Sequence, residues 1–264
     1  MKPDISEFSY AYAITEELIR GYLPPIIAAP VFPSLIQEGQ AGGGYDVMLQ
    51  TAGIPVFLQF KLSDYMVRNS AEEVGRNLIE TPFYRMHLRP ARHSKQHQML
   101  LVLENADNLV YYVAPAFHMP AELNQKYMAR QVVQNSVFIP PNAIGTLPDD
   151  DEHHVAFRKG GPAWLLSTPR QLRHELAAES FAQAVSKRIG ISSRERQLRE
   201  LVGNIAQQMI RIIQEHFGWP QFLSSLDFET FQTGLPPMQQ IAYLSRTFFN
   251  CECVIARIEN RASK

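Results

Sequence analysis

The 264-residue sequence predicts a mixed α/β (α+β) fold, with an α/β module over residues 1–165 and a mostly helical region over residues 166–264. Two observations predict this division. Runs rich in β-branched and aromatic residues recur between residues 54 and 157, as expected for strands. Beyond them, apolar residues from Leu198 to Phe217 recur at helical spacing. A chain of this length can bury a core without disulfide bonds.

The first part begins with a helix and continues with strands. Ser6 is a suitable N-cap for a helix over 8–22. After a proline-rich connector, residues 45–50 and 54–61 are expected to pair as a hairpin, and the second run is apolar on both faces, as in a central strand. The remaining elements are a polar helix over 64–79, strands over 82–88, 98–104 and 109–114, a helix over 120–134, and strands over 136–139 and 153–157.

The second part reads as three helices. Thr168 and Pro169 resemble a helix start, and the apolar side of this first helix extends to Ile189. Ser192 opens a second helix that Gly218 closes, and a third is expected over 236–250. If residues 251–258 form a strand, the sulfurs of Cys251 and Cys253 lie on one face, so this pair is interpreted as structural.

Composition and motifs exclude several classes of protein. The net charge of −1 removes an argument for nucleic-acid binding by a globally basic chain. The sequence has no apolar run long enough for a transmembrane helix and no signal-peptide pattern at its start, so we expect a cytoplasmic location and no membrane partner. Two cysteines cannot form a disulfide framework. No glycine-rich nucleotide-binding motif is present.

Charge is segregated along the chain. Residues 82–97 and 158–199 are rich in lysine and arginine, and the acidic run 149–152 lies between them. Each basic segment is interpreted either as a solvated face or as part of one groove that follows a phosphate backbone. The second interpretation predicts a nucleic-acid contact by Arg85, Arg89, Arg92, Lys95, Arg194 and Arg196. The run 149–154 has metal-ligand residue types, but a polar turn before the strand explains it as well.

Three polar residues occupy places that a core does not favour. Asp46 begins the first strand of the predicted hairpin, and Gln59 and Lys61 end the second, projecting from the same face as Phe57. A buried amide or ammonium without a partner destabilises a fold, so these residues are expected to line a cleft or to pair. An acid, carbonyl-type oxygens and a lysine at one place suit metal-assisted hydrolysis of a phosphodiester.

The spacing of Gly44-Tyr45-Asp46 and Gln59-Phe60-Lys61 resembles the active-site signature of the PD-(D/E)XK nuclease superfamily, the fold of many restriction endonucleases. The resemblance implies a mixed central sheet flanked by helices. It also implies a Mg²⁺ or Mn²⁺ site formed by Asp46, Gln59 and the Phe60 carbonyl, with Lys61 as a catalytic residue. The family's helical glutamate is matched by Glu17 or Glu16, and Glu17 is preferred because it falls on the expected inner face of its helix.

The resemblance implies a divalent-metal-dependent endonuclease that cleaves DNA, of the restriction or phage-defence type. It departs from the family at Gln59, where a carboxylate is usual, which keeps open a catalytically inactive, nucleic-acid-binding or assembly subunit with the same fold. An RNA-directed nuclease is a weaker alternative. Expected partners are DNA, a further copy of the chain in a homo-oligomer, and a subunit encoded nearby, such as an ATPase, a sensor or a methyltransferase.

Overall fold

The computed structural model describes residues 1–22, 54–69, 77–147, 150–172, 176–191, 195–217 and 235–256. The predicted strand 45–50, and with it Asp46, lies outside these residues. In chain order the helices are α1 (Glu7–Glu17), followed by a π-helical turn (Leu18–Tyr22), α3 (Gln96–Asn105), α4 (Pro120–Met128), a 3₁₀ turn (Val133–Asn135), α5 (Pro141–Ile144), α6 (Ala178–Ile191), α7 (Glu195–Phe217) and α10 (Pro237–Thr247). The strands are β1 (Ile54–Phe60), β2 (Ser63–Met66), β3 (Phe83–Leu88), β4 (Leu109–Pro115), β5 (Ser136–Ile139), β6 (His153–Phe157), β7 (Ala163–Leu165), β8 (Arg170–Gln171) and β9 (Glu252–Ala256).

The strands form two sheets. The first has the order β5-β4-β1-β9 and is mixed, because β1 and β4 are parallel whereas β5 and β9 run antiparallel to their neighbours. The second has the order β2-β3-β6-β7-β8 and is antiparallel throughout. The predicted α+β class, with a mixed sheet, flanking helices and a helical C-terminal region, is confirmed.

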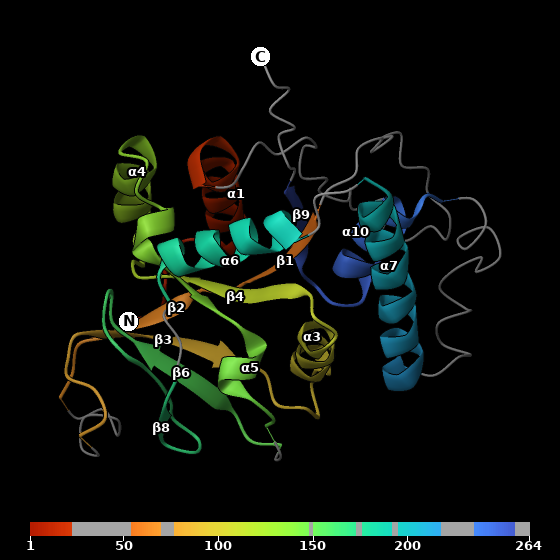
Figure 1. The fold of residues 1–264 in the computed structure, drawn as a ribbon. Helices are drawn as coiled ribbons and strands as arrows, with labels where there is room; N and C mark the ends of the chain where they lie inside the picture. Colours follow the sequence, from red (N-terminus) through yellow and green to blue (C-terminus); the bar gives the residue numbers. More distant parts are fainter. Residues whose placement is uncertain are drawn as a thin grey trace.

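Helices cover both faces of the first sheet (Figure 1). Every residue of β1 is buried, and successive side chains enter two different hydrophobic clusters. Phe57 packs in the cluster that contains α3, α7, α10 and the second sheet, whereas Leu58 packs in the cluster that contains α1 and α6. This two-sided burial explains the unbroken apolar run of β1.

One hydrophobic cluster joins the two regions that the sequence predicts. It contains Leu100 of α3 and Val155 of β6 from the first region, together with Ile205 of α7 and Ile241 of α10 from the second. The second region also supplies β9, which pairs with β1 along Ile54–Leu58. The edges of β1 are therefore occupied by β4 on one side and β9 on the other.

Three sequence predictions of secondary structure are wrong. Residues 98–104 form part of α3 and not a strand, because Met99, Leu100 and Leu103 bury one side of a helix. The polar helix predicted from residue 64 is replaced at its start by β2, which pairs with β3. Residues 170 and 171 form β8 against β7, so the helix predicted from Thr168 begins only with α6.

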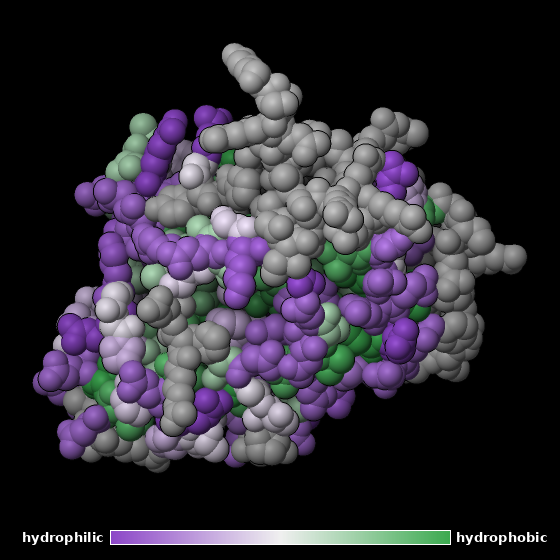
Figure 2. Space-filling view, viewed as in Figure 1, coloured by the Kyte–Doolittle hydropathy of each residue, from purple (hydrophilic) through white to green (hydrophobic). Residues whose placement is uncertain are grey.

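The other predicted helices and strands within the described residues are present, with α4 ending earlier than predicted and a 3₁₀ turn following it. Ser6 caps α1 as expected, since its hydroxyl accepts a hydrogen bond from the Ser9 amide. Figure 2 shows hydrophilic side chains over much of the described surface on one face, with hydrophobic side chains in smaller areas between them. In the part of the chain that the structure describes, no helix is both long and apolar enough to cross a bilayer.

Candidate functional site

The predicted site residues Gln59 and Lys61 lie at the C-terminal end of β1, on the side that faces α3. The side chain of Gln59 is buried, and its amide nitrogen donates a hydrogen bond to the Phe60 carbonyl at 3.0 Å. Its amide oxygen accepts a hydrogen bond from the side chain of Gln96, the first residue of α3. The polar atoms of Gln59 are therefore satisfied inside the protein, as a buried amide requires.

Gln96 also binds Lys61. The Lys61 ammonium donates to the Gln96 side-chain oxygen at 3.2 Å, while the Gln96 nitrogen donates additionally to the Phe249 carbonyl at 3.0 Å. The backbone amide of Lys61 still donates to Val113 on β4, which fixes the start of this side chain at the end of the sheet. One amide thus connects β1, α3 and the segment between α10 and β9.

Lys61 is half-buried and lies among charged side chains. Burial lowers the pKa of the Lys61 ammonium, the Glu7 carboxylate raises it, and Arg89 lowers it further. Glu7 is an exposed residue of the first turn of α1, yet partial burial of its carboxyl raises its pKa, while Lys61 and Arg89 lower it. Among the glutamates of α1, Glu7 is therefore the one whose charge acts on Lys61.

Glu17, the glutamate that the sequence favours, is bound to the backbone of a distant segment. Its burial beside Tyr10, Ala13 and Ile14 confirms that it lies on the inner face of α1. However, its carboxylate accepts hydrogen bonds from the backbone amides of Val132 at 2.7 Å and Val133 at 3.4 Å.

Burial raises the pKa of Glu17 and these two hydrogen bonds lower it. Glu7 and Glu17 are ten residues apart on α1, which at the helical rise separates their backbones by about 15 Å. The alternative residue, Glu16, forms an ion pair with Arg20 in the π-helical turn that follows α1.

The predicted basic residues divide into two groups. Arg89, Arg92 and Lys95 are exposed in the segment between β3 and α3. Arg85 lies on β3 itself, is half-buried and faces Asp64 at 3.7 Å. His97 of the same basic run is buried, with its ring nitrogens bound to the Tyr112 hydroxyl and the Gly145 carbonyl, so it belongs to the core.

Three described arginines of the second basic region bind three different parts of the chain. Arg158 faces Glu80, Arg170 donates to the Ala143 carbonyl, and Arg188 binds Asp107. Arg194 lies outside the described residues, and Arg196 belongs to the first turn of α7. None of the contacts described for this region involves Lys61, whereas Arg89 is the predicted basic residue whose charge reaches Lys61.

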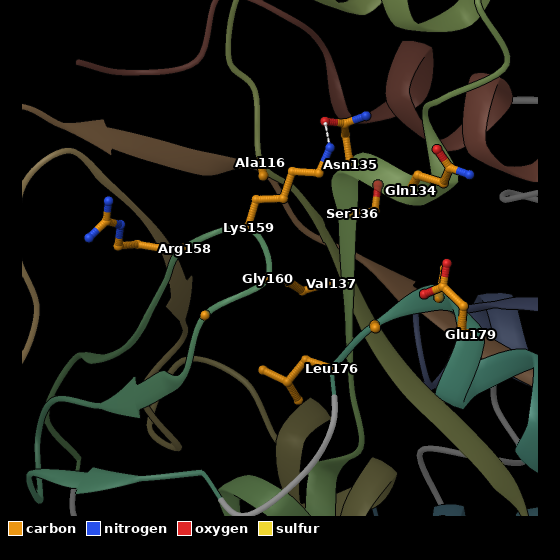
Figure 3. A pocket seen from close by; sticks show the side chains of 13 residues that line it. Ala116, Gln134, Asn135, Ser136, Val137, Arg158, Lys159, Gly160, Leu176 and Glu179 are labelled. Carbon is orange, nitrogen blue, oxygen red and sulfur yellow. Dashed lines mark hydrogen bonds between the residues drawn. The ribbon is translucent and has the colours of Figure 1, made fainter.

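A pocket lined by other residues also lies in the described part of the chain. It has a volume of about 660 Å³ and is lined by the Arg158–Gly161 turn, β5 and the start of α6. Figure 3 shows the Lys159 ammonium turned to the Asn135 side chain, to which it donates at 2.8 Å. Gln59, Lys61 and Glu17 are not among its lining residues, so the predicted catalytic residues and this pocket are separate.

The oxygen atoms described near Lys61 are of the kind that hard divalent cations bind. They comprise the Gln59 side-chain oxygen, the Phe60 carbonyl and the Glu7 carboxylate. The Gln59 oxygen accepts from Gln96, so a cation there would compete with that hydrogen bond. Asp46, the predicted acidic ligand, lies outside the described residues.

Sequence reasoning missed Gln96 and Glu7. The sequence predicts a strand over 98–104, so it does not place Gln96 at the start of a helix. The spacing of Met99, Leu100 and Leu103 is the signal that indicates this helix. Glu7 directly follows the N-cap Ser6, and this place in the first turn was the available signal. An acidic residue there is also a common helix-stabilising choice, so the signal is not specific.

The chain was compared with protein-family models, with curated proteins and with solved structures, and none of them matched. The likeness to the PD-(D/E)XK signature is therefore carried by the residues of the sequence itself. What the end of β1 can do chemically follows from its own contacts, above all from those of Lys61 and Gln96.

Glu17→Ala separates a structural from a catalytic role of this residue. We expect a loss of about 2 kcal/mol in the free energy of unfolding, because two buried amides lose their acceptor. Urea denaturation measures this loss. Any metal-dependent cleavage of DNA by the folded protein should persist.

The matched control is Glu16→Ala, which removes only a surface ion pair, worth about 0.5 kcal/mol. If Glu17→Ala instead abolished cleavage and left stability unchanged, Glu17 would be the catalytic carboxylate that the sequence favours.

Proposed function

We propose that this protein is a divalent-metal-dependent nuclease that hydrolyses phosphodiester bonds in DNA, with Lys61 in its active site. The observation that carries the proposal is the environment of Lys61. Its ammonium is half-buried at the end of a central strand and donates to the neutral amide of Gln96. Lysines are seldom buried, and those that serve stability are usually paired with a carboxylate.

The roles follow from the contacts. Asp46, Gln59 and the Phe60 carbonyl would hold Mg²⁺ or Mn²⁺, which when bound polarises a phosphate oxygen and lowers the pKa of water. Lys61 orients the attacking water and balances the charge that develops on the phosphate. Gln96 is a positioning residue, because it holds both Lys61 and Gln59. Arg89 is exposed and close enough to act on the charge of Lys61, so it suits a phosphate contact.

A second candidate function is favoured by one specific observation. The Gln59 side chain is hydrogen-bonded at both ends, to Gln96 and to Phe60. An amide also brings no charge to a cation, which weakens metal binding relative to a carboxylate. These facts favour a nucleic-acid-binding or assembly subunit that keeps the nuclease fold without cleaving.

Lys61→Ala and Asp46→Ala test the nuclease directly. Each variant should reduce Mg²⁺- or Mn²⁺-dependent nicking of plasmid DNA at least about 100-fold, since each removes a group that acts in the transition state. The control Lys187→Ala removes an exposed lysine of α6 and should cleave like wild type. EDTA should stop cleavage in every active sample.

The outcomes separate the two candidates. Full cleavage by both site variants would remove Lys61 and Asp46 from the active site. A wild-type chain that binds DNA and does not cleave it with either metal would be the inactive subunit. Thermal unfolding of each variant shows whether its fold is intact.

The exposed segment between β3 and α3 supplies a test of DNA binding. Arg92→Ala combined with Lys95→Ala should weaken DNA binding, and the slope of log K against log salt should become shallower by about 1.8, or about 0.9 for each phosphate that the protein no longer neutralises. Arg85 is left unchanged because it faces Asp64. Fluorescence anisotropy of labelled DNA at several salt concentrations gives both quantities.

The matched control is the double variant Arg68→Ala and Lys187→Ala, which makes the same change in charge at exposed positions elsewhere. An equal loss of affinity and slope in both double variants would show a general charge effect. It would contradict a DNA contact by this particular segment.

A further inference from the structure

Two histidines and a glutamate lie close together at the end of the second sheet where β3 ends and β6 begins. His87 of β3 and His154 of β6 lie directly opposite each other in adjacent antiparallel strands, and their ring centroids are 5.1 Å apart. Glu152 lies one residue before β6. One ligand atom from each of the three residues lies within 4.8 Å of the other two.

We propose that His87, Glu152 and His154 bind a divalent transition-metal ion, with Zn²⁺ preferred. Two imidazole nitrogens and one carboxylate oxygen suit Zn²⁺ and its neighbours in the periodic table, whereas Mg²⁺ favours ligands that are all oxygen. Three protein ligands leave a tetrahedral ion one position for water or for an anionic substrate. The proposal does not rest on the proposed nuclease activity.

The backbone brings the three side chains to one place. Cross-strand partners such as His87 and His154 hold their β-carbons about 5 Å apart. Residues 152 and 154 are two positions apart, so their side chains leave the chain on the same side where it is extended. Adjacent residues of one chain rarely face the same ion, but here Glu152 and His154 alternate and the third ligand, His87, comes from another strand.

Rotation of the three side chains would bring their ligand atoms to the distances that a bound ion needs. Ligands of tetrahedral Zn²⁺ lie about 2.1 Å from the ion, so their atoms must approach more closely than the 4.8 Å limit observed. His87 and Glu152 are exposed and His154 is half-buried, so rotamers can change without repacking a core. The site is also open to solvent, which gives the ion a path of entry.

The charges nearby point to the kind of fourth ligand. Besides Glu152, the charged groups that act on His87 are the cations Lys61, Lys2 and Arg89. An ion held by two neutral imidazoles and one carboxylate keeps a net positive charge. An oxyanion such as a phosphate or a carboxylate would therefore be favoured over a cation at the open position.

Metal binding to the full chain, without an affinity tag and without DNA, tests this proposal. Zn²⁺ is measured by isothermal titration calorimetry, and Co²⁺, its spectroscopic substitute, by visible absorption. We expect one ion for each chain. His87→Ala and His154→Ala should each weaken binding at least about 100-fold, since loss of even an outer-shell partner weakens it 10- to 100-fold. Glu152→Gln, which keeps the shape and removes the charge, should also weaken it.

The matched control is His93→Ala, an exposed histidine between β3 and α3, which should bind like wild type. The absence of a bound ion, or equal affinity in the His87, His154 and His93 variants, would overturn the proposal. Because the readout is binding and not cleavage, an inactive wild-type protein that binds Zn²⁺ at these residues would refute the nuclease and leave the metal site standing.

Discussion

A single amide side chain, that of Gln96, ties together three segments that are far apart in the sequence. It donates to Gln59 and to the Phe249 carbonyl, and it accepts from Lys61. The end of β1, the start of α3 and the segment before β9 therefore depend on one another. Because buried polar groups need partners, a change at any of these three places alters the environment of Lys61.

The position of Lys61 follows from this constraint. Strand β1 is buried on both faces and is paired along both edges, so it can carry polar side chains only near its end. There the chain has an amide and an ammonium in place of apolar residues. Burial lowers the pKa of the ammonium, which means that the site disfavours its charged form. Environments that disfavour the ordinary charge state of a side chain are common at functional sites.

Much of this site was predictable from local patterns. The unbroken apolar run identified β1 as a central strand, and the alternation of side chains placed Gln59 on the face of Phe57. The fold class followed from the same periodicities. These features depend on neighbours in the sequence, which is why the sequence alone predicts them.

Features that depend on distant pairing could not be predicted in this way. The sequence predicts a hairpin between residues 45–50 and β1, but within the described residues β1 pairs with β4 and β9, and the pairing with β9 joins residues about two hundred positions apart. Likewise, His87 and His154 meet only through the register of β3 and β6, which no local pattern specifies. For Glu17, the inner-face position follows from local spacing, whereas its hydrogen-bond partners, Val132 and Val133, are more than a hundred residues away and could not be predicted.

The free energy of unfolding of Lys61→Met is the most direct test of the central claim, which is that Lys61 is retained for function at the expense of stability. Replacing buried, ion-paired side chains with apolar side chains of similar volume is often neutral or stabilising by about 1–4 kcal/mol, and Lys61 donates to an uncharged amide. The hydrogen bond from the charged ammonium to Gln96 that this variant removes is worth about 1.5–3 kcal/mol, which relief of the desolvated charge is expected to offset. We therefore expect urea denaturation to show a variant at least as stable as the wild type. A loss of more than about 2 kcal/mol would contradict the account, because it would show that Lys61 serves the fold.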